Sequence, residues 1–315
     1  MDVQQPRPVT LRHLHIETPL VESHALSTRA GRSIWLKLES SQPCGSFKIR
    51  GIGHACNEHA RRGARRFILS SGGNAGIAAA YAGRRLEIPV TVVVPQTTTE
   101  RAKELIRQQS GDVIVHGASW QEANAMTQSL LGERDVSLHP FDDPLVWKGH
   151  ATLVDEVVRS GVKPDAIVLS VGGGGLLCGV AEGLRRNDWA DIPIFAVETI
   201  GADSFAQALQ ARRRVELPHI SSIATSLGAR QVCQQAFDLP QHHPIRSVVV
   251  SDLQAVQACM GFFEDHGTVV EPACGAALAV VRNYASLLRD YRTVLVVVCG
   301  GTGVTLEQLA HWLQQ

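Results

Sequence analysis

Short apolar runs typical of β-strands alternate with longer segments of helical periodicity through most of the 315-residue sequence. Parallel strands need crossover connections, which helices usually supply, so this alternation predicts open, mostly parallel sheets flanked by helices. The strand-like runs of the first series are 66–69, 90–94, 113–116 and 136–139. Helical patterns precede this series at 51–62 and follow its first three strands at 74–86, 98–109 and 120–131. The predicted fold class is α/β.

A turn-rich stretch at 140–149, PFDDPLVWKG, interrupts the alternation, and a second series begins after it. Its strands are predicted at 165–171, 194–198, 247–250 and 293–298, with an earlier strand at 33–38. Its helices are predicted at 151–160, 176–186, 204–211, 253–266, 274–288 and 305–314. We therefore expect two lobes: a large domain of residues 1–48 and 141–315, and a small domain of residues 49–140.

The composition favours a small-molecule ligand over a polymer. Thirty basic and thirty acidic residues cancel, and no basic stripe with interleaved aromatic residues occurs, which argues against nucleic acid and anionic membranes as partners. No run of 18 apolar residues exists and residues 1–17 contain no apolar segment, so we expect neither a membrane span nor secretion. Seven scattered cysteines without a CxxC pair indicate a reducing compartment and no structural metal, so a cytoplasmic location is expected.

Three predicted strand-to-helix junctions are rich in glycine: SSGGNAG at 70–76, SVGGGGLLCG at 170–179 and CGGTG at 299–303. Ligands bind at the carboxyl ends of strands in open α/β folds, so these junctions predict a binding site. Four adjacent glycines cost roughly 2 to 4 kcal/mol of chain entropy relative to alanines, which close approach to a ligand would explain. At the start of a helix their N–H groups suit a phosphate, although a tight turn is the alternative. Neither GxxxxGK[ST] nor GxGxxG occurs, which leaves one phosphate monoester rather than a triphosphate or dinucleotide.

The stretch SSQPCGSFKIRG at 40–51 places Lys48 between an aromatic and an aliphatic residue, after two small residues. Such a lysine can be buried, and burial can lower a lysine pKa by about 3 to 5 units, which frees the amine as a nucleophile. The alternative is an ordinary solvated lysine at a helix start. A reactive lysine together with a cradle for one phosphate suggests pyridoxal phosphate, whose aldehyde forms a Schiff base with lysine.

Seven motifs in order extend this suggestion from about Thr18 to the C-terminus: SSQPCGSFKIRG, SSGGNAG, GHA at 149–151, SVGGGGLLCG, VETIGADSF, VEPACGAAL and VVVCGG. Together they resemble the serine/threonine dehydratases of the fold-type-II pyridoxal-phosphate enzymes, above all the short L-serine dehydratase/L-threonine deaminase type. The resemblance implies a two-lobed fold like that of tryptophan synthase β, a homodimer, and deamination of L-serine and/or L-threonine to pyruvate or 2-oxobutanoate plus ammonia. The chain ends soon after the last motif, so a regulatory domain with allosteric control by isoleucine is not expected.

The resemblance also implies roles for individual residues. Lys48 would form the internal aldimine and act as general base, with Ser71 as a second catalytic residue. Phe47 would lie against one face of the pyridine ring and Asn74 would hydrogen-bond the ring hydroxyl. The phosphate would be held by Gly172, Gly173, Gly174, Gly175 and Leu176, and the substrate carboxylate by Ser71, Gly72, Gly73 and Asn74. Without the motifs, Phe47 would be an ordinary core residue, Asn74 a helix N-cap and Ser71 a turn former.

Further roles implied by the resemblance concern the ring nitrogen and a cation. Cys299 would sit opposite the pyridine nitrogen, where a neutral thiol favours expulsion of a β-leaving group over transamination. A buried structural cysteine is the alternative. A monovalent cation, potassium, is expected near Glu198, Ala202, Ser204, Leu227 and Ala229. The alternative for Glu198 is an ordinary helix-start interaction.

Two positions depart from the family pattern. Ser226 stands where close relatives carry alanine against the second ring face, a change expected to affect cofactor tilt and rate. Gly72 stands where serine racemases carry the serine that protonates the second face of the substrate, so elimination is favoured over racemisation. The alternatives left open are a β-replacing synthase acting on an activated serine and a non-catalytic cofactor-binding relative. A dehydrogenase is disfavoured by the missing dinucleotide motif.

Overall fold

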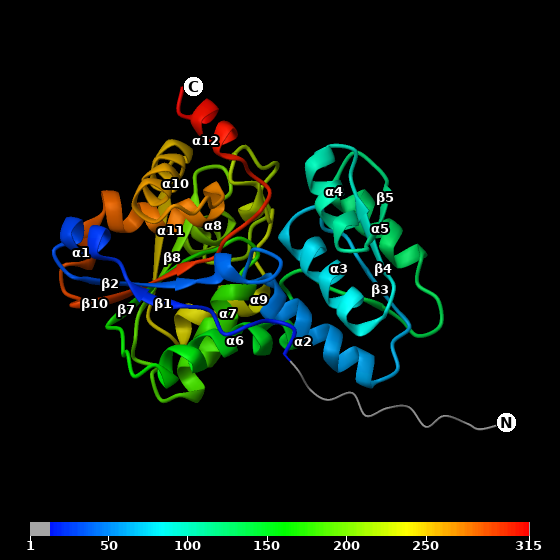
Figure 1. The fold of residues 1–315 in the computed structure, drawn as a ribbon, viewed down its shortest axis with the longest axis horizontal. Helices are drawn as coiled ribbons and strands as arrows, with labels where there is room; N and C mark the ends of the chain where they lie inside the picture. Colours follow the sequence, from blue (N-terminus) through cyan, green and yellow to red (C-terminus); the bar gives the residue numbers. More distant parts are fainter. Residues whose placement is uncertain (1–12, 315) are drawn as a thin grey trace.

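The computed structural model describes residues 13–314 and has two lobes, each built around its own sheet and its own hydrophobic core (Figure 1). The α/β class predicted from the alternating pattern is confirmed. Residues 1–12, and with them most of the N-terminal segment used to argue against secretion, lie outside the described residues. Within residues 13–314, no helix has the length and apolar character needed to cross a membrane.

The larger lobe contains a six-stranded sheet in the order β1-β2-β10-β7-β8-β9, parallel except for the edge strand β1, which runs antiparallel to β2. Its strands are β1 (Leu20–Glu22), β2 (Ser33–Leu38), β7 (Ala166–Ser170), β8 (Ile194–Thr199), β9 (Ile245–Val250) and β10 (Thr293–Val298). Every residue of β7 and β8 is buried, because helices cover both faces of the sheet.

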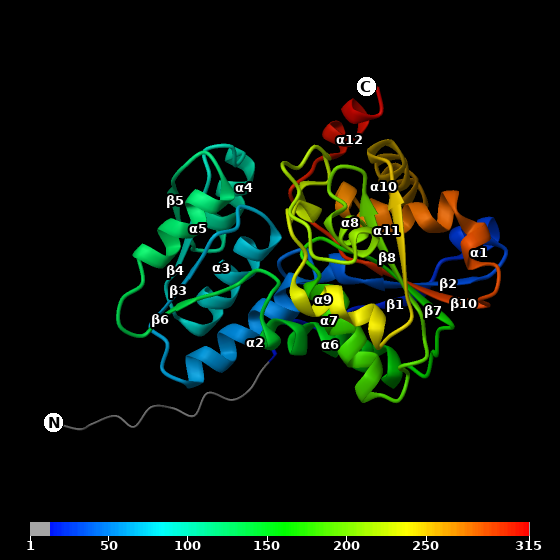
Figure 2. The ribbon, with the colours of Figure 1, turned by 180° about the vertical axis from the view of Figure 1, so that it is seen from behind.

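Helices lie on both sides of this sheet, α6 and α7 on one face and α10 and α11 on the other (Figures 1 and 2). The helices of the lobe are α1 (His24–Ala30), α6 (Pro144–Arg159), α7 (Gly175–Arg186), α8 (Ser204–Ala211), α9 (Gln234–Asp238), α10 (Asp252–His266), α11 (Pro272–Asn283) and α12 (Leu306–Trp312). The lobe also contains short 3-10 helices, at Glu39–Ser41, Thr225–Leu227, Leu239–Gln241 and Ala285–Leu288.

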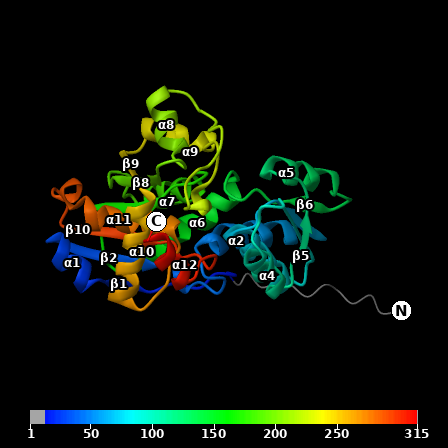
Figure 3. The ribbon, with the colours of Figure 1, turned by 90° about the horizontal axis from the view of Figure 1, so that it is seen from above.

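The smaller lobe contains a four-stranded parallel sheet in the order β5-β4-β3-β6. Its strands are β3 (Arg66–Leu69), β4 (Val90–Val94), β5 (Asp112–Val115) and β6 (Asp135–Ser137), and its helices are α3 (Asn74–Leu86), α4 (Glu100–Gln108) and α5 (Trp120–Ser129). Helix α2 (Lys48–Arg61) leads into this lobe and packs against both α3 and α6, so it lies where the lobes meet (Figure 3).

Two predicted helix starts are wrong. The stretch read as a turn at 140–149 is mostly the beginning of α6, because Asp143 caps the helix by accepting a 2.7 Å hydrogen bond from the Leu145 N–H, with Pro144 at the first position. Helix α2 begins three residues earlier than expected, at Lys48. The predicted helix 274–288 ends at Asn283 and continues as a 3-10 turn.

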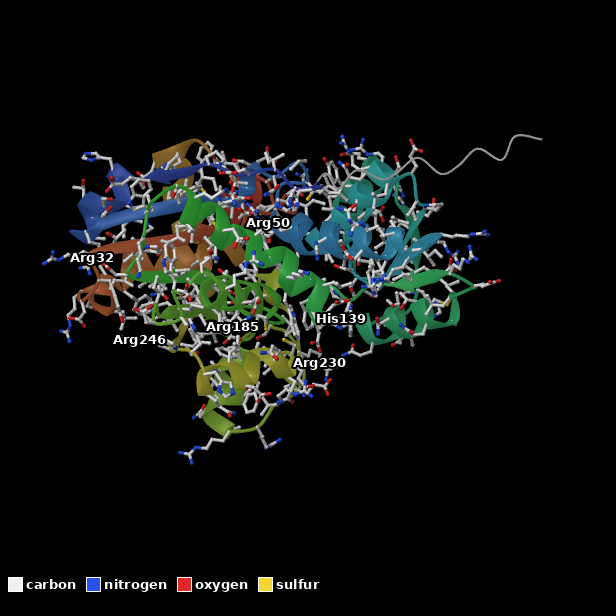
Figure 4. All side chains as sticks on the ribbon, turned by 90° about the horizontal axis from the view of Figure 1, so that it is seen from below. Arg32, Arg50, His139, Arg185, Arg230 and Arg246 are labelled. Atoms are coloured by element: carbon white, nitrogen blue, oxygen red, sulfur yellow. The ribbon has the colours of Figure 1, made fainter. Side chains whose placement is uncertain are left out.

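A buried ion-pair cluster anchors α2 to the larger lobe. The Arg50 guanidinium is fully buried and lies 2.7 Å from the Glu39 carboxylate and 2.6 Å from the Glu156 carboxylate, and Lys37 adds a second cation 2.6 Å from Glu156. Two cations and two carboxylates neutralise one another. Figure 4 shows Arg50 at this junction of the lobes. The cluster therefore fixes the first turn of α2, which carries Lys48.

Candidate active site

Lys48, the first residue of α2, directs its amine toward the segment that links the lobes. Its Nζ donates a 3.0 Å hydrogen bond to the Pro140 carbonyl and lies 5.1 Å from the centre of the Phe47 ring. Burial lowers the pKa of Lys48 from 10.5 to about 8, and the nearby Glu271 carboxyl, where ionised, acts in the opposite direction. Such an amine is partly neutral at physiological pH and can act as a nucleophile.

The tetraglycine turn joins β7 to the N-terminus of the 12-residue helix α7. Gly174 has a φ of +94°, and no larger side chain fits beside it, because an added Cβ would lie 2.4 Å from the Ala236 Cβ. A Cβ on Gly173 would lie 2.3 Å from the Phe141 ring. In residues 13–314, the main-chain N–H groups of 172–176 donate to no protein acceptor. Unpaired N–H groups at a helix N-terminus form an anion site.

Two adjacent residues connect the amine to this turn. Pro140 accepts the hydrogen bond from Lys48, and the ring of Phe141 packs against Gly173. The segment is held in place by His139, whose Nδ1 accepts the Phe141 N–H at 3.3 Å and the Asp142 N–H at 2.8 Å. Figure 4 shows His139 at the junction of the lobes. The Lys48 amine and the tetraglycine turn are therefore joined through two adjacent residues of the segment that links the lobes.

The third glycine-rich junction lies directly against the residues before Lys48. The Phe47 N–H donates to the Cys299 carbonyl at 3.2 Å, and the Gly301 N–H donates to the Gly45 carbonyl at 2.8 Å. A hydrogen bond with Cys274, together with burial, raises the pKa of the Cys299 thiol well above its usual range. Cys299 is therefore a neutral thiol close to the Lys48 amine.

Asn74, the first residue of α3, reaches from the smaller lobe to the larger one. Its Nδ2 donates a 2.7 Å hydrogen bond to Oε1 of Glu271 and lies 3.5 Å from the hydroxyl of Ser226. The alternative reading of Asn74 as a helix N-cap is wrong, because Gly73 occupies the cap position. The Ser226 side chain is exposed and lies beside Asn74.

Glu271 was missed in the sequence analysis, although it belongs to the motif VEPACGAAL. It is only 7% exposed, and burial raises the pKa of its carboxyl to about 7. Hydrogen bonds from Ser226 and Asn74 and the charge of Lys48 lower this pKa, but by less than burial raises it. The available signal was an acidic residue inside the otherwise apolar run TVVEPACGAALAVV. A carboxylate so placed is rarely buried without a partner.

His150 is a second residue that the sequence analysis left without a role. Its ring lies 4.9 Å from the Phe47 ring, and neither ring nitrogen has a hydrogen-bond partner among the described residues. Burial, together with the charges of Lys48 and Arg50, holds the pKa of His150 well below its usual range. His150 is therefore a neutral support for Phe47.

The loop Ser71–Gly73 lies at the carboxyl end of β3, half-buried at its first two residues and exposed at Gly73. The space beside Gly72 is filled by Thr98, since an added Cβ would lie 2.6 Å from the Thr98 methyl group and 2.9 Å from its hydroxyl. A side chain at position 72 would require Thr98 to move. From the same lobe, Arg101 donates a 3.1 Å hydrogen bond to the carbonyl of Thr302.

The sequence matches the family model described as "Pyridoxal-phosphate dependent enzyme" over residues 11–300. The chain belongs to the pyridoxal-phosphate-dependent enzymes. It is 48% identical to the L-serine dehydratase/L-threonine deaminase of Mus musculus, over 94% of each chain. It is 47% identical to the "Serine dehydratase-like" protein of the same organism, over 94% of this chain and 93% of that one.

Among solved structures, the chain is similar to a fungal L-serine ammonia-lyase from Rhizomucor miehei. The TM-score is 0.90 at 34% identity, over 96% of this chain and 99% of that chain. These relatives confirm the fold-type-II resemblance stated from the motifs. As a member of this family, the chain uses pyridoxal phosphate as its cofactor.

Two of the residues expected to hold a cation lie at the start of α8, Ser204 as its first residue and Glu198 through its carboxylate. The buried Glu198 carboxylate accepts 2.8 Å hydrogen bonds from the N–H groups of Phe205 and Ala206, the helix-start interaction weighed as the alternative. Burial raises the pKa of Glu198 to about 8. The hydroxyl of Ser204 is buried without a partner among the described residues. The carbonyl of Leu227 accepts the Ala229 N–H at 2.7 Å.

Proposed function

We propose that this chain is an ammonia-lyase that removes the β-hydroxyl and the amino group of L-serine and L-threonine, giving pyruvate or 2-oxobutanoate and ammonia. The observation that carries the proposal is the meeting of the Lys48 amine with the tetraglycine turn through Pro140 and Phe141. The names of the relatives, L-serine dehydratase/L-threonine deaminase and L-serine ammonia-lyase, support the substrate class.

The residues of the site fit pyridoxal phosphate, because the unpaired N–H groups at the turn suit its phosphate and a buried amine of lowered pKa suits its aldehyde. When bound, the cofactor would supply an electron sink for the electrons of a broken bond at the substrate Cα. The phosphate would be held by Gly172, Gly173, Gly174, Gly175 and Leu176.

Five side chains would position the reacting groups, and one of them would remove a proton. Lys48 would hold the cofactor and, once displaced by the substrate amine, remove the Cα proton through Nζ. Phe47, backed by His150, would cover one face of the ring, and Ser226 the other. Cys299, as a neutral thiol, would face the ring nitrogen without protonating it.

The substrate carboxylate would bind the loop of Ser71, Gly72, Gly73 and Asn74 at the N-terminus of α3, where main-chain N–H groups favour an anion. Ser71 would add a hydroxyl close to the reacting groups. Gly72 offers no acid or base, and Thr98 fills the space beside it. Since no side chain at position 72 could protonate the second face of the substrate, elimination from L-amino acids is favoured over racemisation.

We also propose that the domain boundaries lie after residues 48 and 140, that the protein is a cytoplasmic homodimer, and that it binds potassium. The cation would lie near Glu198, Ala202, Ser204, Leu227 and Ala229. The orphaned hydroxyl of Ser204 beside the buried Glu198 carboxylate supports this site.

The test is a labelling experiment combined with a substrate panel. The holoenzyme is reduced with sodium borohydride and digested, and we expect the cofactor on the peptide containing Lys48. Release of 2-oxo acid is then measured with L- and D-serine and L- and D-threonine, in potassium and in sodium. Cofactor attached to another lysine would refute the assignment of Lys48.

Two further outcomes would favour the alternatives. Product that forms only when sulfide and an activated serine are added would indicate a β-replacing synthase. A cofactor absorption band that serine leaves unchanged would indicate a non-catalytic relative. The Lys48→Ala variant, measured in parallel, should show neither a reducible cofactor adduct nor 2-oxo acid release.

A further inference from the structure

One hydrogen bond in the site crosses from lobe to lobe and ends on a residue that the proposed function leaves without a role. Asn74 begins α3 in the smaller lobe, and Glu271 directly precedes α11 in the larger lobe. The 2.7 Å bond between Asn74 Nδ2 and Glu271 Oε1 joins two side chains that are only 8% and 7% exposed.

The position of Glu271 at the start of α11 does not explain its carboxyl group. The residue occupies the N-cap position, but its side chain makes no cap hydrogen bond, and Pro272 begins the helix without needing one. The carboxyl group lies instead against Gly301, where an added Cβ would come within 2.1 Å of the Glu271 Cδ. Gly301 thus leaves space for this carboxyl beside the loop that carries Cys299.

We propose that Glu271 is a positioning residue: its carboxylate fixes the orientation of the Asn74 amide, so that a donor rather than an acceptor faces the ring oxygen of the cofactor. The inference rests on the proposed function, since it assumes that Asn74 contacts that oxygen. It adds a residue and a physical task that the sequence motifs did not assign.

The orientation of the Asn74 amide decides which atoms it presents to its neighbours. An asparagine side chain has two donors on one side and an acceptor on the other, and the two orientations have almost the same shape. Above its pKa of about 7, the Glu271 carboxyl is ionised and can only accept, so in that pH range it requires the Nδ2 side of Asn74 to face it. The second N–H of Nδ2 makes only a long, 3.5 Å hydrogen bond to the hydroxyl of Ser226, an exposed residue, so a donor points away from Glu271 on that side.

The reversed amide would be strongly disfavoured. Its Oδ1 would face the Glu271 carboxylate inside a buried region, which leaves two acceptors in contact and a charge without its donor. If the carboxylate were absent, the two orientations would become similar in free energy. Part of the population would then present Oδ1 to the oxygen of the cofactor, and the contact would be repulsive.

The test compares Glu271→Gln with the wild-type holoenzyme and with Glu264→Gln, a control that neutralises an exposed carboxylate on α10. Glutamine keeps the size of the side chain but can either accept or donate, so it no longer selects one amide orientation. At pH 8.5, where the Glu271 carboxyl is ionised, we expect the dissociation constant for the cofactor to rise about tenfold, as for the loss of one charge-assisted hydrogen bond. The visible band of the bound cofactor should also shift, whereas Glu264→Gln should match the wild type in both measurements.

A double variant separates positioning from simple bonding between the lobes. When Asn74→Asp is combined with Glu271→Gln, the donor and acceptor are exchanged, so the cross-lobe hydrogen bond can form again. We expect the thermal midpoint to recover, while cofactor affinity stays low, because the new carboxylate at position 74 would offer only acceptors to the cofactor.

The possible outcomes distinguish failure of the positioning role of Glu271 from failure of the proposed function. Recovery of both stability and cofactor affinity in the double variant, or an unchanged band and affinity in Glu271→Gln, would overturn the positioning role. The proposed function would survive either result, because it is judged on the wild type alone. A wild-type protein without a cofactor band or 2-oxo acid release would refute the proposed function and this inference together.

Discussion

The pKa of Lys48 predicts how fast the apoenzyme takes up its cofactor at each pH. Only the neutral amine attacks the aldehyde, and burial lowers the pKa of Lys48 from 10.5 to about 8. At pH 7 a group of pKa 8 is about 9% neutral, whereas one of pKa 10.5 is about 0.03% neutral, a difference of about 300-fold in reactive amine. The loading rate should therefore rise about tenfold per pH unit up to pH 7 and level off above about pH 8 to 9.

The assay follows the visible band after apoenzyme is mixed with pyridoxal phosphate between pH 6 and 10.5. The same aldehyde reacting with the side chain of blocked free lysine serves as the reference, because it corrects for titration of the cofactor itself. Lys48→Ala should give no band at any pH. A loading rate that keeps rising beyond pH 9.5, in parallel with the reference amine, would show that the Lys48 amine is solvated and would refute the reasoning.

Three further predictions concern the turn, the ion cluster and the cation site. Gly173→Ala should weaken cofactor binding at least about tenfold, because the new methyl would lie 2.3 Å from the Phe141 ring; unchanged binding in a titration would show that the turn does not hold the phosphate. Arg50→Met should lower the free energy of unfolding by about 3 to 5 kcal/mol in urea, because two buried carboxylates lose their shared partner, and a loss below 1 kcal/mol would contradict this. Potassium at ten times its dissociation constant should stabilise the protein by about 1.4 kcal/mol relative to a cation that does not bind. Glu198→Gln should abolish that difference in melting temperature, and an undiminished difference would place the cation elsewhere.

The fold could be predicted because the signals that specify it are local. The strands 66–69 and 293–298 and the helices 74–86 and 204–211 have the predicted bounds, since apolar runs and helical periodicity are read within a few residues. The start of α6 was missed because Pro144 and Asp143 are turn residues and helix-start residues at once. Only the residues that follow distinguish the two readings.

Candidate site residues could be found in the sequence where a local motif points to them. They could not be found where their role depends on a contact between residues that are far apart in the chain. The tetraglycine turn and Lys48 are singled out by their neighbours in sequence, and the structure joins the two through Pro140 and Phe141. Glu271 and Asn74 are 197 residues apart, so no local pattern reveals their hydrogen bond. His150 likewise becomes informative only once α6 brings its ring against Phe47. The implied roles of the cofactor, substrate and cation ligands stay predictions until they are tested.

The arrangement explains why two sheets are needed for one site. The tetraglycine turn and Cys299 follow strands of the larger sheet, whereas Ser71 and Asn74 follow a strand of the smaller one. The carboxyl ends of parallel strands in a single sheet present loops along one edge, but a planar ring must be approached from several sides. Cross-lobe bonds such as those of Asn74 to Glu271 and Arg101 to the Thr302 carbonyl hold the two sets of loops together. It follows that substitutions at these bonds should affect cofactor binding before they affect the stability of either core.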